Sequence, residues 1–297
     1  MSNAYSIVHM LRLCTLLSVA AACTHLYSQS HYMKKEKTMN NHKPSQGPST
    51  WLASIPSLKN AGSFVGKDKQ GNQVMLEWQK TTLVSPDFVT AYSATWEIAE
   101  HGYTPVEMQF LQAYPEVVGK EAYFKPFEPL FASGVAAVDW RQVEVAMRSV
   151  LKGHFVLDPS LYSDAILKAY AHDIIFVVTI KDQATNQQLG FITFMVRVGY
   201  AHGDIKVMSF AVSPAHQCRG LGKLLMGAIF NIVPQVKRIF LHTRVTNERA
   251  LQAYRSWGFM DDQHPVIDHP LNMAHWSCLE YKADQSNVLQ KAAALLK

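Results

Sequence analysis

SPAHQCRGLGKLLM, residues 213–226, is the stretch that decides the fold. An apolar run, IKVMSFAV at 205–212, precedes it and predicts a strand. A second apolar run surrounds Gly222 and continues to Val233, which predicts a helix that Pro234 ends. Gly220 and Gly222 therefore lie in a tight turn between a strand and a helix.

The segments around this turn predict a sheet of mixed direction. Strands expected at 173–180, 189–198 and 205–212 are joined by short polar turns, which favours an antiparallel meander. A fourth strand at 238–245 follows the helix, and this order implies parallel pairing through a right-handed crossover. A helix from Thr246 or Asn247 through Trp257 and a strand at 274–281 follow. We predict the fold class α/β (α+β), with a mixed, mostly antiparallel central sheet and one parallel βαβ crossover.

The preceding half of the chain is more helical. Residues 51–73 are rich in Gly, Ser, Pro and Lys and indicate a loop or linker, and a short strand is expected at 74–78. A helix is expected at 87–101, with Asp87 as its N-cap and Gly102 just past its end. Another helical stretch at 138–153 ends at Gly153. We therefore expect one domain at 74–283 with a helical insertion at about 102–170, followed by a tail helix at 284–297.

Composition and charge limit the classes of partner. Hydrophobic residues make up 48% and charged residues 17% of the 297 residues, as in an ordinary globular protein. Residues 1–50 hold five Lys or Arg and one acidic residue, so +4 of the net charge of +5 lies there. The rest of the chain is nearly neutral, whereas non-specific nucleic-acid binding needs a basic face. Nucleic acid is therefore not expected as the main partner.

The N-terminal segment allows two interpretations. The apolar run from Leu13 to Ala22 has the length of a signal-peptide core, and Cys23 after small residues resembles a lipoprotein cleavage site. The alternative is a start site placed too early, with Met33 or Met39 as the true start. Residues 1–50 are treated as a leader, and the run is too short to span a bilayer. Four cysteines, Cys14, Cys23, Cys218 and Cys278, are too few for a disulfide framework and favour a reducing compartment.

The glycine turn itself has the properties of a phosphate site. A helix N-terminus presents unpaired N–H groups and the positive end of the helix dipole, and Arg219 and Lys223 add positive charge. A dinucleotide fingerprint would need glycine at Leu225, and a P-loop would need Ser or Thr at Leu224, so both are excluded. The turn by itself leaves phosphate binding and a purely structural turn equally open.

Two motifs together carry a family resemblance. The loop Gln217-Cys218-Arg219-Gly220-Leu221-Gly222 resembles the Gln/Arg-x-x-Gly-x-Gly/Ala loop of the GCN5-related N-acetyltransferase (GNAT) superfamily. Asn247, Ala250, Tyr254 and Gly258-Phe259, after the strand 238–245, resemble the second conserved segment of that family. The resemblance covers residues 173–282 well and residues 74–172 loosely. It implies the GNAT acyl-CoA N-acyltransferase fold.

The resemblance also implies the positions of the site. Loop residues would bind the CoA pyrophosphate, and pantetheine would pair with the backbone of Phe210 and Val212 where the two parallel strands diverge. A backbone N–H near Ala211 would stabilise the oxyanion, and Tyr254 would protonate the leaving thiolate. Tyr254 could instead be a core aromatic, and Asn247 could contact CoA or only cap its helix. The cofactor-binding set is Phe210, Ala211, Val212, Gln217, Cys218, Arg219, Gly220, Leu221, Gly222, Lys223 and Asn247.

A general base is less well defined. The strand 205–212, where many members carry a glutamate, holds no carboxylate. The candidates are Glu97 and Glu100 on one face of the helix 87–101, with Asp204, His202 or a water chain as alternatives. The alternative for both glutamates is a solvated helix face.

Histidine and cysteine also gather near the C-terminus. His264, His269, His275 and Cys278 lie close to three aspartates, Asp261, Asp262 and Asp268, but their spacing matches no zinc pattern. A polar loop lining the acceptor site is the preferred interpretation, and no metal is expected.

The sequence therefore predicts an acetyl-CoA-dependent N-acetyltransferase that acts on an amine of a small molecule or a protein by direct attack. The alternative is a catalytically idle acyl-CoA-binding domain with a sensing role. Acetyl-CoA is the expected cosubstrate, no stable membrane span is expected, and a homodimer is one option for assembly. A cytoplasmic location follows from the metabolite, with export or lipid anchoring as the alternative if residues 1–23 are a true signal.

Overall fold

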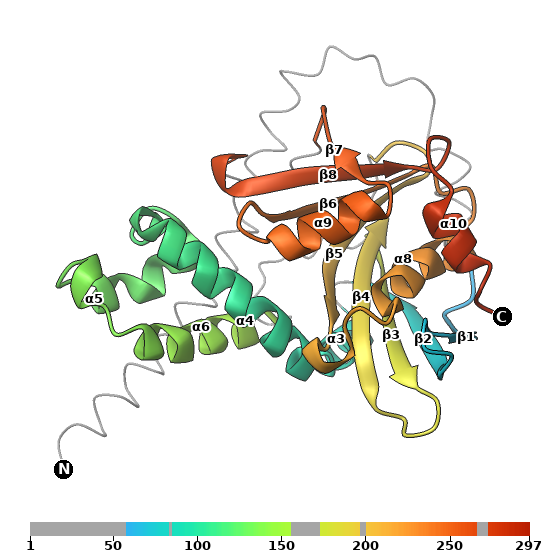
Figure 1. Ribbon diagram of the computed structural model, residues 1–297, viewed down its shortest axis with the longest axis horizontal. Coiled ribbons are helices and arrows are strands. Elements are labelled where there is room, and N and C mark those ends of the chain that lie inside the picture. The colour runs from blue at the N-terminus through green and yellow to red at the C-terminus, as the bar shows by residue number, and fades with distance from the viewer. Residues whose placement is uncertain (1–57, 83–84, 156–172, 197–199, 266–272) are drawn as a thin grey trace.

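The computed structural model describes residues 58–82, 85–155, 173–196, 200–265 and 273–297. Its centre is one sheet with the strand order β1-β2-β3-β4-β5-β6-β8-β7 (Figure 1). The strands span Ala61–Lys67 (β1), Gln73–Thr81 (β2), Ile174–Asp182 (β3), Gln188–Val196 (β4), Asp204–Val212 (β5), Arg238–Arg244 (β6), Met260–Asp261 (β7) and Trp276–Lys282 (β8). Neighbouring strands are antiparallel except β5 and β6, which are parallel. The predicted fold class is confirmed.

Helices cover both faces of this sheet, because strands such as β3 bury side chains on both sides. On one face, α8 (Leu221–Ile232) and α10 (Val288–Ala293) pack on Phe176, Ile192 and other core side chains. On the other face, α3 (Pro86–Ser93) and α4 (Trp96–Ala113) cover Ile175, Val177 and Phe191. The helix α9 (Glu248–Ser256) follows β6. Figure 1 shows α4 and α6 extending to one side of the sheet.

The helical segment has a small core of its own. It consists of α4, α5 (Glu128–Phe131), α6 (Trp140–Phe155) and short 3₁₀ turns at Pro115–Val117, Ala122–Phe127 and Val135–Ala137. Phe110, Phe124 and Met147 are fully buried in it. Gly153 lies inside α6, so the prediction that it ends this helix was wrong.

The predicted helix 87–101 is also incorrect in detail. Ser85, and not Asp87, caps α3 by accepting a hydrogen bond from the Asp87 N–H. The helical conformation is interrupted at Thr95, whose hydroxyl donates to the Tyr92 carbonyl at 2.7 Å. The helix α4 then continues through Gly102 to Ala113. A Cβ at Gly102 would lie 3.2 Å from that of Ala211, so close packing on β5 explains a glycine inside the helix.

The sheet begins earlier in the chain than predicted. β1 lies within residues 51–73, which were expected to be loop or linker, and pairs along its whole length with β2. Val65 of β1 also exchanges two backbone hydrogen bonds of 2.9 Å with Lys297. The two-residue strand β7 was likewise not predicted. The alternating pattern of β1 is weak because most of its side chains are exposed or half-buried. The proposed division into leader, linker, domain and tail stays a prediction.

Candidate functional site

The parallel strands β5 and β6 pair only at one end. Their register runs from Asp204 opposite Arg238 to Lys206 opposite Phe240 and stops there. Beyond that point β5 stays paired with β4, with a bulge between Thr193 and Phe194, and β6 stays paired with β8. The edge of β5 from about Ser209 to Val212 therefore faces an opening in the sheet.

Two residues predicted to bind pantetheine have backbone groups at this open edge. The Phe210 N–H donates to the Tyr103 hydroxyl oxygen at 2.8 Å, and that hydroxyl is 3.3 Å from the Phe210 carbonyl oxygen. The Val212 carbonyl accepts a hydrogen bond from Gln217 Nε2 at 3.0 Å. Side chains thus satisfy an edge that otherwise needs a strand or a ligand.

Ala211 faces differently from its neighbours. The Ser213 N–H donates to the Leu189 carbonyl at 2.8 Å, and bonds to β4 alternate along β5, so the Ala211 N–H points toward β4. Its side chain packs beside Ile98 and Phe191 under α4. The N–H next to Ala211 that faces the open edge is therefore that of Phe210, and the role of an N–H near Ala211 in binding an oxyanion stays a prediction.

The glycine loop has an unusual backbone. Cys218 and Gly220 have φ angles of 64° and 82°, in the left-handed region, and α8 begins at Leu221. A Cβ at Gly222 would lie 2.9 Å from the rings of both Phe210 and Trp257. The loop is therefore packed against the open strand and presents backbone N–H groups at the start of α8.

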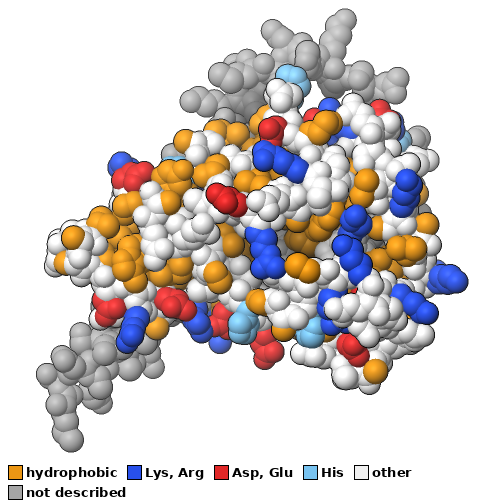
Figure 2. Space-filling model, viewed as in Figure 1, with side chains coloured by type: hydrophobic (Ala, Val, Ile, Leu, Met, Phe, Trp, Pro, Cys, Tyr) orange, Lys and Arg blue, Asp and Glu red, His pale blue; other side chains and the backbone are white. Residues whose placement is uncertain are grey.

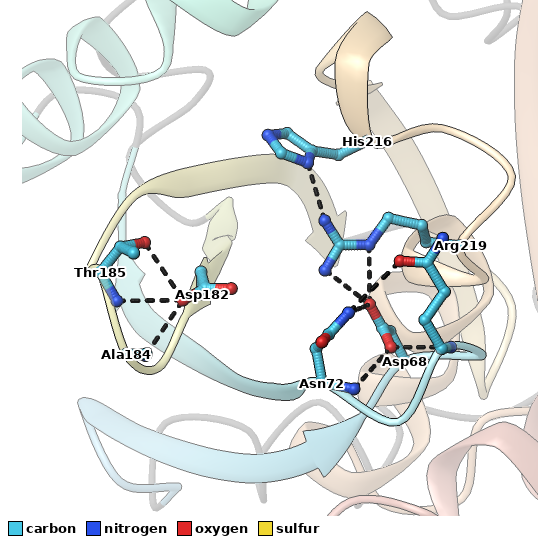
Figure 3. A network of polar contacts seen from close by, with 8 residues as sticks. Asp68, Asn72, Asp182, Ala184, Thr185, His216 and Arg219 are labelled. Carbon is cyan, nitrogen blue, oxygen red and sulfur yellow. Dashed lines mark hydrogen bonds and ion pairs between the residues drawn. The ribbon is translucent and has the colours of Figure 1, made fainter.

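The Arg219 side chain is already bound to groups of the protein. Its guanidinium binds the buried Asp68 carboxylate at 2.6 Å and donates to His216 Nδ1 at 2.7 Å (Figure 3). The Lys69 N–H also donates to the Arg219 carbonyl at 2.9 Å. Asp68 begins the β1–β2 turn, where it accepts hydrogen bonds from the N–H groups of Gln70 and Asn72 at 2.9 Å. The turn between β1 and β2 thus fastens the glycine loop.

Burial alone would raise the pKa of Asp68. Hydrogen bonds from Asn72, Arg219 and Gln70 outweigh this effect and hold that pKa below its usual value. Asp68 is therefore ionised at neutral pH and neutralises Arg219. Other cations lie around the loop: Lys223 is partly exposed in the first turn of α8, the Lys69 side chain lies against Gly220, and Arg249 contacts Cys218. Figure 2 shows Lys and Arg side chains around a hollow with hydrophobic side chains at its floor, near the middle of this face.

The second motif lies on α9. Asn247 caps this helix, since its Oδ1 accepts from the Ala250 N–H at 3.4 Å, while its Nδ2 donates to the Thr243 hydroxyl at 3.1 Å. Tyr254 is buried beside Phe210, with ring centroids 6.2 Å apart. Burial, and to a lesser degree the nearby Tyr103, raises the pKa of Tyr254. Tyr254 therefore belongs to the core and also adjoins the open strand.

The predicted bases have other partners or are exposed. Glu97 is exposed, and Glu100 pairs with Arg148 of α6 at 3.0 Å. Asp204 lies at the far end of β5, where it pairs with Arg238 at 3.2 Å. His202 is bonded to Gln235 at 3.0 Å. The choice of a base among these four residues stays a prediction.

The residues of α4 that meet the opening were missed. They are Tyr103 and, one turn later, the buried Glu107, which binds Arg244 at the end of β6 at 3.1 Å. The Arg244 guanidinium also stacks between the rings of Phe110 and Trp276, at 4.0 and 4.1 Å. The sequence contained a signal for Glu107, because this acidic residue interrupts the apolar helix stripe that includes Ile98 and Phe110.

The histidine and cysteine cluster is dispersed. His275 binds Glu121 at 2.9 Å and packs against Phe110, whereas the side chain of Cys278 lies on β8. His264 is exposed, and Asp268 and His269 lie outside the described residues. In the part of the chain that the structure describes, no group of three such side chains could hold a metal. The same residues include no helix with the length and hydropathy to cross a membrane.

Residues 145–259 match the model of the Acetyltransferase (GNAT) family. The chain contains a GNAT acetyltransferase domain. The match runs from α6 through Phe259 and includes the divergent strands, the glycine loop and the second motif. The predicted family is confirmed for this segment, and the match indicates acyl transfer as the general class of activity.

Several solved structures resemble the GNAT domain and its surroundings. An acyl-CoA N-acyltransferase from Klebsiella pneumoniae, described as putative, is 14% identical, with a TM-score of 0.32 over 36% of this chain and 72% of that one. The PaiA N-acetyltransferase of Thermoplasma acidophilum, in complex with coenzyme A, is 12% identical, with a TM-score of 0.36 over 69% and 98%. The ribosomal-protein-S18-alanine N-acetyltransferase of Escherichia coli is 19% identical, with a TM-score of 0.26 over 35% and 64%. No curated protein matches the chain in sequence. The assignment of the GNAT domain rests on the family model and the two motifs.

Proposed function

We propose that this protein is an acetyl-CoA-dependent N-acetyltransferase that acts on an amine of a small molecule or a protein. The observation that carries the proposal is the end of the parallel pairing at Lys206 and Phe240, beside the glycine loop. On the side of β5 that faces β6, it leaves the backbone of Phe210 and Val212 without a strand partner, while the other side stays paired with β4. An extended pantetheine arm can take the position of the missing strand, because its amides have the same donors and acceptors.

The glycine loop supplies the second half of the cosubstrate site. Backbone N–H groups of residues 217–222 and the positive end of α8 would bind the pyrophosphate. Gly222 lets the loop approach Phe210, and Lys223 adds a charge that Asp68 does not neutralise. Arg219 would act indirectly by fixing the loop to the β1–β2 turn. Asn247 would contribute through the position of α9.

The proposed reaction is direct attack in a ternary complex. The amine nitrogen attacks the thioester carbonyl carbon, and the Phe210 N–H stabilises the oxygen that becomes negative. The C–S bond then breaks, and Tyr254 protonates the departing thiolate. The amine must lose a proton before attack, and that proton leaves through water, since Glu97 is exposed and Glu100 is paired with Arg148. The reaction uses acetyl-CoA as cosubstrate and no metal, and the cytoplasm is the compartment that supplies acetyl-CoA.

Thiol release from acetyl-CoA, measured across a panel of polyamines, amino sugars, aminoglycosides and peptides, tests the proposal. We expect turnover with at least one class of amine and only slow release without amine. Binding of CoA, measured separately by calorimetry, distinguishes the two interpretations of the sequence. Tight CoA binding with no turnover on any amine would establish the idle acyl-CoA-binding domain and overturn the enzyme. The absence of a carboxylate near Phe210 on β5 is the feature that makes this alternative worth testing.

A further inference from the structure

The Tyr103 hydroxyl lies at the point where the acyl group would react. It accepts a hydrogen bond from the Phe210 N–H at 2.8 Å, and it is 3.3 Å from the Phe210 carbonyl oxygen. The short contact uses the hydroxyl as an acceptor, and the long contact uses it as a donor. An acyl oxygen bound by the Phe210 N–H would occupy the same place as this hydroxyl oxygen. The hydroxyl and an acyl oxygen would therefore compete for the same N–H.

We propose that Tyr103 donates a second hydrogen bond to the acyl oxygen during transfer, beside the bond from the Phe210 N–H. This inference rests on the proposed function. When the thioester oxygen takes the Phe210 N–H, the hydroxyl loses its role as acceptor. Its proton, which otherwise faces the Phe210 carbonyl at 3.3 Å or the Ser209 side chain, turns to the acyl oxygen. No covalent bond of Tyr103 forms or breaks, and two donors stabilise the developing negative charge.

The protonation state of the Tyr103 phenol suits a hydrogen-bond donor. Burial raises the pKa of Tyr103 and outweighs the opposite effect of its hydrogen bonds with Phe210 and Ser209. The phenol therefore keeps its proton throughout the neutral range. A donor that stays neutral in the ground state becomes more valuable as the oxygen becomes charged.

The position of the ring is fixed by packing. Gly102, the preceding residue, lets α4 approach Ala211 of β5 closely. The Tyr103 ring packs against Phe155 of α6, with centroids 5.9 Å apart. Because packing holds the ring, an acyl oxygen can take the place of the hydroxyl oxygen only when the ring tilts slightly, while α4 stays in place.

Tyr92 provides a matched control. Its hydroxyl is hydrogen-bonded to the Ser209 side chain at 2.8 Å, and its ring also packs on Phe155, with centroids 4.5 Å apart. Tyr92→Phe therefore removes one hydroxyl from the same aromatic cluster. The Tyr92 hydroxyl contacts the Ser209 side chain, whereas the Tyr103 hydroxyl contacts the Phe210 backbone. Thermal unfolding of both variants checks that they fold.

The test compares kcat, KM for acetyl-CoA and CoA affinity in the full-length wild type, Tyr103→Phe and Tyr92→Phe. We expect Tyr103→Phe to lower kcat on the order of 10²-fold, with CoA affinity unchanged, because one oxyanion donor is lost. Tyr92→Phe should keep most of the wild-type rate. Unchanged kcat in Tyr103→Phe, or tighter acetyl-CoA binding at unchanged kcat, would overturn the inference, since the hydroxyl would then be only an obstacle.

A second measurement covers the case in which Tyr103→Phe does not fold. Difluorotyrosine at position 103 keeps the shape of the ring and lowers its pKa, so the alkaline fall in kcat should move to lower pH. A purely structural role would leave the pH profile in place. Turnover by the wild type is measured first, because its absence would refute the proposed function and not the role of Tyr103 within it.

Discussion

At the scale of single residues, Tyr254 combines a buried position with a phenol that keeps its proton. It packs with Phe210, Trp257 and Phe259, and burial raises its pKa. A phenol of raised pKa keeps its proton near neutral pH and is present as a donor, although the same burial makes it a weaker acid toward a thiolate. The same side chain can therefore contribute to the core and to the proposed transfer.

Tyr254→Phe separates these two contributions. The ring stays, so packing and CoA affinity should change little, whereas loss of the proton donor should lower kcat by about 10²- to 10⁴-fold. Steady-state kinetics with calorimetric CoA binding measures both quantities. Unchanged turnover would remove Tyr254 from the mechanism and leave it as a core aromatic.

Asp68 makes stability depend on pH in the acid range. Its folded-state pKa lies below the ordinary value of 3.8, so its contribution to stability is complete above that value and disappears as the pH falls through the lowered pKa. Asp68→Asn should destabilise the protein at pH 7 by about 3 kcal/mol, because Arg219 loses its buried partner. The difference from wild type should shrink as the pH falls below 3.8.

Asp182→Asn is the control for this prediction. Its carboxylate accepts from the Ala184 and Thr185 N–H groups at 3.0 Å in a turn drawn beside the Asp68 network (Figure 3), and Arg219 acts on it only through longer-range attraction and not through an ion pair. Denaturant unfolding at several pH values should show a smaller loss for Asp182→Asn. An equal loss at pH 7 for both variants would contradict the special role given to the Asp68–Arg219 pair.

At the scale of elements, the start of α8 is the unit that would bind phosphate. Lys223→Met keeps the length of the side chain and removes its charge, so CoA affinity should fall by about three- to tenfold at low salt. The dependence of the dissociation constant on salt should also weaken, because one charge is lost from the site. Lys291→Met, on α10, is the control and should leave both quantities unchanged.

The boundaries of elements show what local pattern can predict. The meander β3-β4-β5, the crossover to β6 and the cap of α9 by Asn247 agree with expectation. These features depend on neighbouring residues, such as the alternation of a strand or a capping side chain. The helix α4 differs because Gly102 and Pro105, which locally disfavour helix, lie inside it. Packing of α4 on β5 outweighs the local preference there.

At the scale of the whole molecule, the two ends of the described fold stabilise each other. The C-terminal residues after α10 lie along β1, where Val65 and Lys297 exchange hydrogen bonds, and Figure 1 shows the C-terminus beside β1. Leu296 is only 7% exposed, and a Cβ at Gly66 of β1 would lie 2.9 Å from it. The adjacent Leu295 is 60% exposed. The β1–β2 turn that fastens the glycine loop is therefore linked to the C-terminus.

Leu296→Ala and Leu295→Ala form a matched pair that tests this link. Leu296→Ala should lower the free energy of unfolding by about 2–4 kcal/mol, because it leaves a cavity between β1 and α10. Leu295→Ala should change it by less than about 0.5 kcal/mol. Denaturant unfolding measures both, and a similar small effect of the two substitutions would show that the C-terminal residues do not hold β1.

The sequence by itself determined the antiparallel meander of β3, β4 and β5, the crossover to β6 and the two motifs of the GNAT domain, because each depends on residues that lie close together in the chain. The tertiary structure alone decided which side chains meet at the opening. Tyr103 reaches Phe210 across 107 positions, and Arg219 reaches Asp68 across 151. No local periodicity encodes such contacts, since they depend on where α4 and the β1–β2 turn pack against the sheet.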